Sequence, residues 1–144
     1  MSILVPVDFS PVTQRVCDVA IEAAKARNGK IWLIHVAYPD PDFVGYDTGP
    51  DVVRDQVAAE FRREHKELRE LADKMAESGV EVTPLLIQGP TVTTILEQAE
   101  HHDVELIVMA THGRGVMYQM FVGSVSEGVL HRSSRPVLMV PAGA

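Results

Sequence analysis

Cysteine is nearly absent from this sequence of 144 residues, which contains only Cys17. A single cysteine has no partner for an internal disulfide, so the fold does not depend on an oxidising compartment. Cys17 falls on or near the apolar side of a predicted helix. We therefore expect its thiol to be buried rather than to act as a nucleophile.

Long hydrophobic runs are also missing, because no apolar stretch approaches the roughly 20 residues that a transmembrane helix needs. The N-terminal apolar run has no basic residues before it and stops at Asp8, which is unlike a signal peptide. These two absences predict a protein without membrane association, located in the cytoplasm.

Positive charge is scarce, since 13 lysine and arginine residues stand against 20 aspartate and glutamate residues and give a net charge of −7. Nucleic-acid binding that depends on neutralising phosphates is therefore not expected. Hydrophobic residues make up 46% of the chain, which is ordinary for a globular protein. The length predicts one domain spanning residues 1–144.

Five short apolar runs alternate with four helical patterns along the chain. The runs are rich in Val, Ile and Leu and nearly continuous, as is typical of strands buried on both faces. They span residues 3–7, 31–36, 80–87, 106–110 and 136–140, and the helical patterns span residues 12–26, 51–78, 91–101 and 124–132. This order predicts an α/β fold, an open five-stranded parallel sheet of Rossmann-like type with helices on both faces.

Capping signals mark the ends of the first predicted helix. Asn28 and Gly29 supply a C-terminal stop. Ser10 directly precedes Pro11, which suits the first helical position, so Ser10 is a better N-cap than Asp8. This assignment leaves the Asp8 carboxylate available for another role.

Two longer segments have less specific patterns. The many charges of residues 51–78 are interpreted as the solvated face of a long amphipathic helix. The connection from Pro39 to Pro50 is longer than most connections in a compact domain. It is interpreted either as a lid or as an irregular excursion.

Candidate ligand-binding residues follow the strands, since ligands of open parallel sheets bind beyond the carboxyl ends of the strands. Asp8 follows the first strand and could accept hydrogen bonds from a ribose hydroxyl or a base amine. His35 lies at the end of the second strand. A lone histidine there is interpreted as a hydrogen-bonded structural residue rather than a ligand.

A glycine-bearing turn follows the fourth strand. Residues 109–115 read Met-Ala-Thr-His-Gly-Arg-Gly, and Gly123-Ser124 then leads into the last helix. Backbone N–H groups at a helix N terminus bind phosphate, and the hydroxyl groups of Ser124 and Ser126 would add donors. The alternative is a plain loop in which Ser124 is an ordinary N-cap.

Five segments in this order make the chain similar to the universal stress proteins, small α/β proteins of the adenine-nucleotide alpha-hydrolase-like group. They are residues 3–10 (ILVPVDFS), 33–36 (LIHV), 106–114 (LIVMATHGR), 123–127 (GSVSE) and 134–140 (SRPVLMV). The ATP-binding branch has a signature of Gly, two residues, Gly, nine residues, and Gly followed by Ser or Thr. Gly113 and Gly123-Ser124 match this signature, whereas Ala110 replaces its first glycine.

The resemblance implies that the chain binds ATP or another adenine nucleotide, with Mg²⁺, as a regulatory module in a stress response. It places Pro6, Val7 and Asp8 along the nucleotide pocket, with Asp8 near the ribose or base, and the main chain of Val36 against adenine. It places the ribose and phosphates against Met109, Ala110, Gly113, Gly123, Ser124, Val125 and Ser126. From their own position in the turn after the fourth strand, His112 and Arg114 would lie beside these phosphates and could contact them.

Alanine at position 110 has two interpretations. If the backbone there requires a positive φ, alanine costs on the order of 1 kcal/mol. If only a close approach to the ligand matters, the methyl group weakens one contact. In either case we expect weakened rather than lost nucleotide binding.

Two other functions stay open beside nucleotide regulation. A nucleotide-free homodimeric adaptor with the same fold is the first, although such branches of the resembled family generally lack the Gly-Ser element. An enzyme is not expected, because the sequence has no dinucleotide fingerprint, Walker motif or nucleophile elbow. The run from His101 to Asp103 is a poor metal chelator, because adjacent helical side chains point apart. Slow ATP hydrolysis, or phosphate transfer to Ser124 or Ser126, is left open.

The last predicted strand, residues 136–140, is strongly apolar and lies near the C terminus. A chain end often supplies the edge of a sheet, and an exposed apolar edge invites pairing. Members of the resembled family commonly form homodimers through this strand. We therefore expect a homodimer through residues 136–140, together with an unidentified protein partner.

Overall fold

The predicted strands form one parallel sheet in a computed structural model of the chain, which describes residues 1–37, 50–112 and 123–142, the side chains of residues 50–54 excepted. The elements along the chain are β1 (Ser2–Pro6), α1 (Thr13–Arg27), β2 (Lys30–Ala37), α2 (Pro50–Ala76), β3 (Val82–Gln88), α3 (Thr91–His101), β4 (Leu106–Ala110), α4 (Ser124–Arg132) and β5 (Val137–Val140). The predicted α/β fold is confirmed. The connection from Pro39 to Pro50, interpreted as a lid or an excursion, falls outside the described residues except for Pro50.

The strand order is β3-β2-β1-β4-β5, with every neighbouring pair parallel. The chain moves outward from β1 through β2 to β3, and then returns to add β4 on the other side of β1. Pairing of β1 with β4 covers Ile3–Leu106 and Leu4–Ile107, and both strands run on beyond these pairs. The order of the strands therefore reverses between β1 and β4, where open α/β sheets bind ligands.

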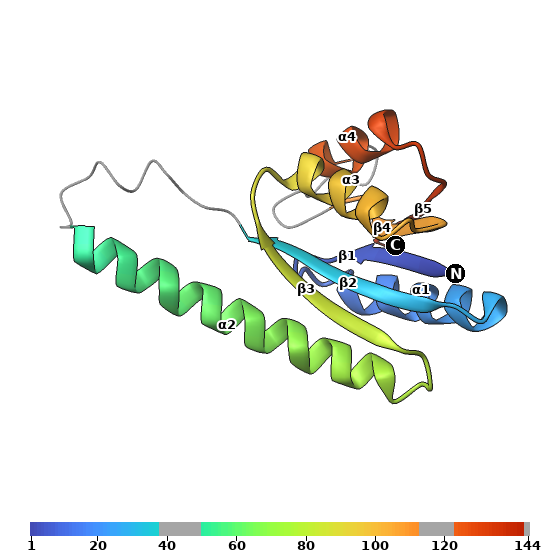
Figure 1. Cartoon of the computed structure of the whole chain (residues 1–144), viewed down its shortest axis with the longest axis horizontal. Helices are drawn as coiled ribbons and strands as arrows, with labels where there is room; N and C mark the ends of the chain where they lie inside the picture. The colour runs from blue at the N-terminus through green and yellow to red at the C-terminus, as the bar shows by residue number, and fades with distance from the viewer. Residues whose placement is uncertain (38–49, 113–122, 143–144) are drawn as a thin grey trace.

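Helices cover both faces of the sheet, with α1 and α2 on one side and α3 and α4 on the other (Figure 1). Successive residues of β1 point to opposite faces, so Ile3 and Val5 pack toward α1 while Leu4 packs toward α3 and α4. All three side chains are fully buried. This double burial explains why the strand sequences are nearly continuous in apolar residues.

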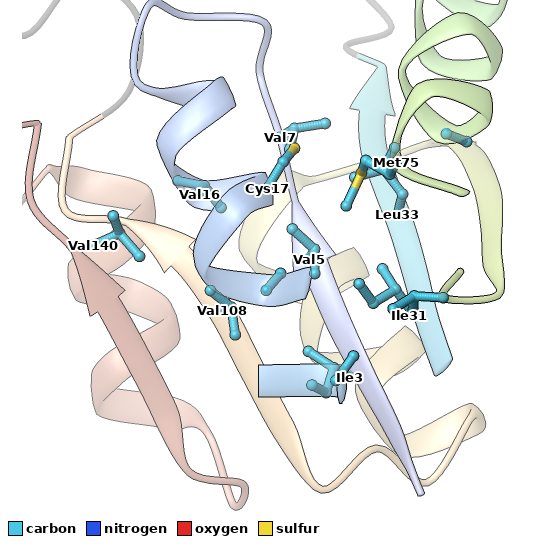
Figure 2. Close-up of a cluster of buried hydrophobic side chains, with 14 of the residues drawn as sticks. Ile3, Val5, Val7, Val16, Cys17, Ile31, Leu33, Met75, Val108 and Val140 are labelled. Carbon is cyan, nitrogen blue, oxygen red and sulfur yellow. The ribbon is translucent and has the colours of Figure 1, made fainter. Parts of the chain in front are cut away.

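The core beneath α1 includes Cys17, which lies among Val5, Val7 and Leu33 (Figure 2). Its predicted burial is confirmed, and burial is the largest cause that raises the pKa of its thiol to about 12. Among the described residues, no helix combines the length and the apolarity that a membrane crossing needs.

The turn between β1 and α1 differs from the prediction. The helix begins at Thr13 with Val12 as N-cap and no side-chain capping bond, so the assignment of Ser10 as N-cap is wrong. The amide of Ser10 instead donates to Oδ1 of Asp8 at 3.0 Å, and Phe9 between them has a φ of 61°. Asp favours a local turn of this kind. A second turn follows, in which the amide of Thr13 donates to the carbonyl of Ser10 at 3.0 Å, so α1 begins only at Thr13.

The C terminus of α1 follows the sequence signal. Asn28 is the C-cap with a φ of 54°, and the amide of Gly29 donates to the carbonyl of Ala24 at 2.8 Å. A left-handed residue of this kind satisfies the last carbonyl groups of a helix. The chain turns here directly into β2.

Candidate functional site

A cavity of about 620 Å³ opens at the carboxyl ends of β1, β2 and β4. This volume is typical of small-molecule sites. The cavity lies where the strand order reverses, with α2 forming one wall and the first turn of α4 another. Eight predicted site residues line it: Pro6, Val7, Asp8, Val36, Met109, Ala110, Val125 and Ser126.

The four other predicted site residues have different positions. Gly123 and Ser124 are the N-cap and the first residue of α4, next to lining residues Val125 and Ser126. Gly113 and Arg114 lie outside the described residues. The described residues of the glycine signature, Ala110 and Gly123-Ser124, therefore lie at or next to the cavity.

The first turn of α4 is fastened to the end of β4 by two hydrogen bonds. The amide of Gly123 donates to the carbonyl of Thr111 at 2.7 Å, and Oγ of Ser126 donates to the carbonyl of Ala110 at 2.6 Å. The Ser126 hydroxyl proton is thus used within the protein in this structure, and its predicted donation to phosphate would require this bond to break. The amides of Ser124, Val125 and Ser126 belong to the first turn and have no acceptor within the helix.

Ala110 is an ordinary strand residue at the end of β4, and its φ is not positive. The interpretation that this position demands a left-handed backbone is therefore wrong. Ala110 lines the cavity, so its methyl group occupies space beside any ligand. Only the second interpretation, a loss of close approach, remains.

Asp8 lines the cavity as predicted, but its carboxylate also has a local role. The bond from the amide of Ser10 to Oδ1 holds the side chain in the turn after β1. Asp8 is not the N-cap of α1, as predicted, and its carboxylate accepts this bond within the turn before the helix. A carboxylate fixed in this way is pre-oriented toward the cavity wall.

His35 connects three elements beside the cavity. Its Nδ1 lies 2.8 Å from the carbonyl oxygen of Val7, and its Nε2 contacts Oε2 of Glu64 on α2. A carbonyl oxygen only accepts, so Nδ1 carries a proton, and the contact with Glu64 requires a second proton between the two side chains. The interpretation of His35 as a hydrogen-bonded structural residue is confirmed, and His35 also lines the cavity.

The wall that α2 contributes was missed by the sequence analysis. Four side chains at spacings of three and four residues line the cavity: Glu60, Arg63, Glu64 and Glu67. This spacing places them on one face of the helix. The charge run was assigned to solvent, and Glu64 contradicts that assignment because its side chain is only 18% exposed. The periodic spacing was the available signal.

The two walls of the cavity differ in electrostatic character. The N terminus of α4 presents backbone N–H groups and the positive end of the helix dipole. The α2 wall presents three carboxylates and the guanidinium of Arg63. A ligand with an anionic group at one end and hydrogen-bond donors at the other would suit both walls.

The histidines at the end of α3 lie in a different cluster. The ring of His102 stacks on Trp32 with centroids 3.9 Å apart, and Nζ of Lys30 lies 4.2 Å from the Trp32 centroid. Within the described part of the chain, no three His, Cys, Asp or Glu side chains form a group suited to a metal ion.

Comparison with known proteins gives consistent matches along the chain. The model of the universal stress protein family matches residues 1–141. A universal stress protein from Thermus aquaticus is 31% identical over 140 residues, which cover 96% of this chain and 97% of that protein. The structure of UspA from Lactobacillus plantarum is similar with a TM-score of 0.83 at 23% identity, over 97% of both chains. A universal stress protein solved in complex with cAMP has a TM-score of 0.74 at 22% identity, over 99% of this chain and 98% of that one.

Proposed function

Since the chain belongs to the universal stress protein family, we propose that it binds ATP or another adenine nucleotide in the cavity and acts as a regulatory module. The observation that carries this proposal is the placement of one cavity against the ends of β1 and β2, the α2 wall and the N terminus of α4. The complex of a similar fold with cAMP supports an adenine ligand.

In the proposed orientation the base lies beside Val36 and the phosphates lie against α4. The amides in the first turn of α4 attract anions, whereas the carboxylates of α2 would repel them. The α2 wall suits the amino group and ring edges of a base. Mg²⁺ would arrive with the phosphates, consistent with its preference for phosphate oxygens over an all-protein cage. We assign no catalytic residue, so regulation rather than turnover is the proposed activity.

A calorimetric titration with ATP and Mg²⁺ tests this proposal. Ser124→Asp is the informative variant, because Ser124 is exposed and an acidic residue in the first turn of a helix favours folding. Its new carboxylate would repel the phosphates, whereas Ser124→Asn adds a side chain of similar size without charge. We expect saturable binding for the native protein and the Asn variant, and much weaker binding for the Asp variant. No binding by the native protein at millimolar ATP would favour a nucleotide-free adaptor.

We also propose that two copies of the chain pair through β5. This strand is at one edge of the sheet, and Leu138 on it is 39% exposed. An apolar strand edge favours pairing with a second strand. Sedimentation should give a dimer at micromolar concentration for the native protein and a monomer for Leu138→Glu. Leu130→Glu is the matched control, since Leu130 is 48% exposed and lies on the helix α4 rather than on the edge strand.

A further inference from the structure

His112 follows β4 and lies against the cavity with only 9% of its surface exposed. Its Nδ1 lies 2.9 Å from Oγ1 of Thr111. Its Nε2 is buried and has no hydrogen-bond partner. The side chain therefore has one satisfied nitrogen and one unsatisfied nitrogen.

An unsatisfied buried nitrogen calls for an explanation, because most buried side-chain polar atoms in native proteins have a partner. Three other side chains among the described residues have such an atom, namely Ser10, Thr13 and Trp32. None of these three lines the cavity, whereas His112 does. The residue with the unmet hydrogen bond thus lines the proposed ligand site.

The position of His112 is tied to the anion-attracting end of the cavity. The carbonyl of the preceding residue, Thr111, accepts a hydrogen bond from the amide of Gly123. The carbonyl of Ala110 accepts one from the hydroxyl of Ser126. These two bonds hold the segment that leads to His112 against the first turn of α4. The imidazole therefore lies near the amides of that turn, which have no acceptor within the helix.

We propose that Nε2 of His112 donates a hydrogen bond to a phosphate oxygen of the bound nucleotide. The proposal rests on the proposed function and adds a specific anion-binding residue to it. In the neutral ring, the Thr111 hydroxyl donates to Nδ1 and the ring proton is on Nε2. In the imidazolium, Nδ1–H donates to Oγ1 of Thr111 and Nε2–H still faces the phosphate. Both forms offer the donor, and the ligand supplies the acceptor that the protein lacks.

Two substitutions of similar size separate donation from packing. His112→Leu keeps an apolar volume without a donor, and His112→Gln restores an N–H group at the end of the side chain. Titrations compare ATP, which carries phosphates, with adenosine, which does not. We expect His112→Leu to weaken ATP binding about tenfold or more and to leave adenosine binding unchanged, since a hydrogen bond to a charged group is lost. His112→Gln should recover most of the ATP affinity.

The outcomes distinguish this inference from the proposed function. If His112→Leu binds ATP as tightly as the native protein, the inference is overturned and nucleotide binding stands. Equal losses for ATP and adenosine would assign His112 to the shape of the cavity and also overturn it. Inorganic tripolyphosphate is the third probe. Binding of tripolyphosphate that depends on His112, without binding of ATP or adenosine, would support the phosphate contact and overturn the nucleotide function. No binding of any probe by the native protein would overturn both.

A measurement on the native protein guards against variants that do not fold. Nitrogen NMR of the labelled imidazole reports the hydrogen bonding of Nε2 directly. ATP should shift the Nε2 resonance of His112, and adenosine should not. An Nε2 resonance that stays unchanged at saturating ATP would overturn the inference.

Discussion

Nε2 of His35 contacts Oε2 of Glu64, and this contact joins β2 to α2 across 29 residues of sequence. Both side chains are mostly buried, with 14% and 18% of their surfaces exposed. Nδ1 of the same ring is held by the carbonyl of Val7 at the end of β1. One imidazole therefore links the α2 wall to the strand ends that form the cavity.

Removing the Glu64 carboxylate should destabilise the protein. Glu64→Ala leaves Nε2 of His35 without its partner, and we expect the free energy of unfolding to fall by about 1–3 kcal/mol in urea titrations. Glu64→Gln can still donate to Nε2 and should lose less. Glu67→Ala, one turn further along the same wall and exposed, should stay within about 0.5 kcal/mol of the native value. Equal effects of the two alanine variants would show that the contact with His35 does not stabilise the fold.

The Cys17 thiol should make stability fall in alkaline solution. Burial, with a smaller effect of Asp18, raises its pKa from 9.0 to about 12, so the folded protein keeps a proton that the unfolded chain loses. The contribution of the buried thiol to the free energy of unfolding is fully present below pH 9 and is lost as the pH rises toward 12. Urea titrations at pH 8 and pH 10 should show a smaller decrease for Cys17→Ala than for the native protein. The same decrease in both would contradict this assignment.

The stacked ring of His102 should titrate below its ordinary range. Its pKa is lowered from 6.5 by desolvation first, and then by the charges of His101 and Lys30. The folded state therefore binds this proton less tightly than the unfolded chain does. The free energy of unfolding should accordingly decrease as the pH falls below about 6.5. NMR titration of His101→Gln should give a higher pKa for His102 than in the native protein. His65→Gln, on α2, is the control that should leave it unchanged, and an equal response to both would contradict the assigned cause.

Periodic apolar patterns predicted the elements well because burial on a sheet or helix face is a local property of the sequence. The predicted ranges 91–101, 106–110 and 124–132 coincide with α3, β4 and α4. The predicted start of α1 was wrong because the chain makes one more turn before the helix, closed by the bond from the amide of Thr13 to the carbonyl of Ser10. Neither composition nor periodicity indicates whether such a turn will form before a helix.

Periodicity groups the charged residues of the α2 wall on one helix face, but it does not show that this face lies against the strand ends. Glu60, Glu64 and Glu67 look alike in the sequence, and only the crossing of α2 over β2 selects Glu64 as the partner of His35. The same holds for His112, whose burial depends on how the end of β4 meets α4. Long-range packing therefore decided the parts of the site that the motif did not contain.

The size of the side chain at position 110 should control nucleotide affinity. Ala110 lies in β4 with an ordinary φ, so a substitution there changes the space in the cavity rather than the strain of the backbone. Calorimetric titration with ATP should give an affinity that decreases from Ala110→Gly through the native protein to Ala110→Val. Glycine should also lower the free energy of unfolding, by at most about 0.5–1 kcal/mol, because glycine loses more conformational freedom than alanine when the chain folds.

The same substitution outside the cavity is the control for this series. Ala142→Val adds the same two methyl groups at an exposed position after β5, and ATP affinity should not change. Valine suits a strand, so weaker binding by Ala110→Val with unchanged stability would assign the loss to occupied space. An affinity that is the same for glycine, alanine and valine would mean that no ligand atom approaches position 110, and the nucleotide would then have to lie further from β4 than the first turn of α4 implies.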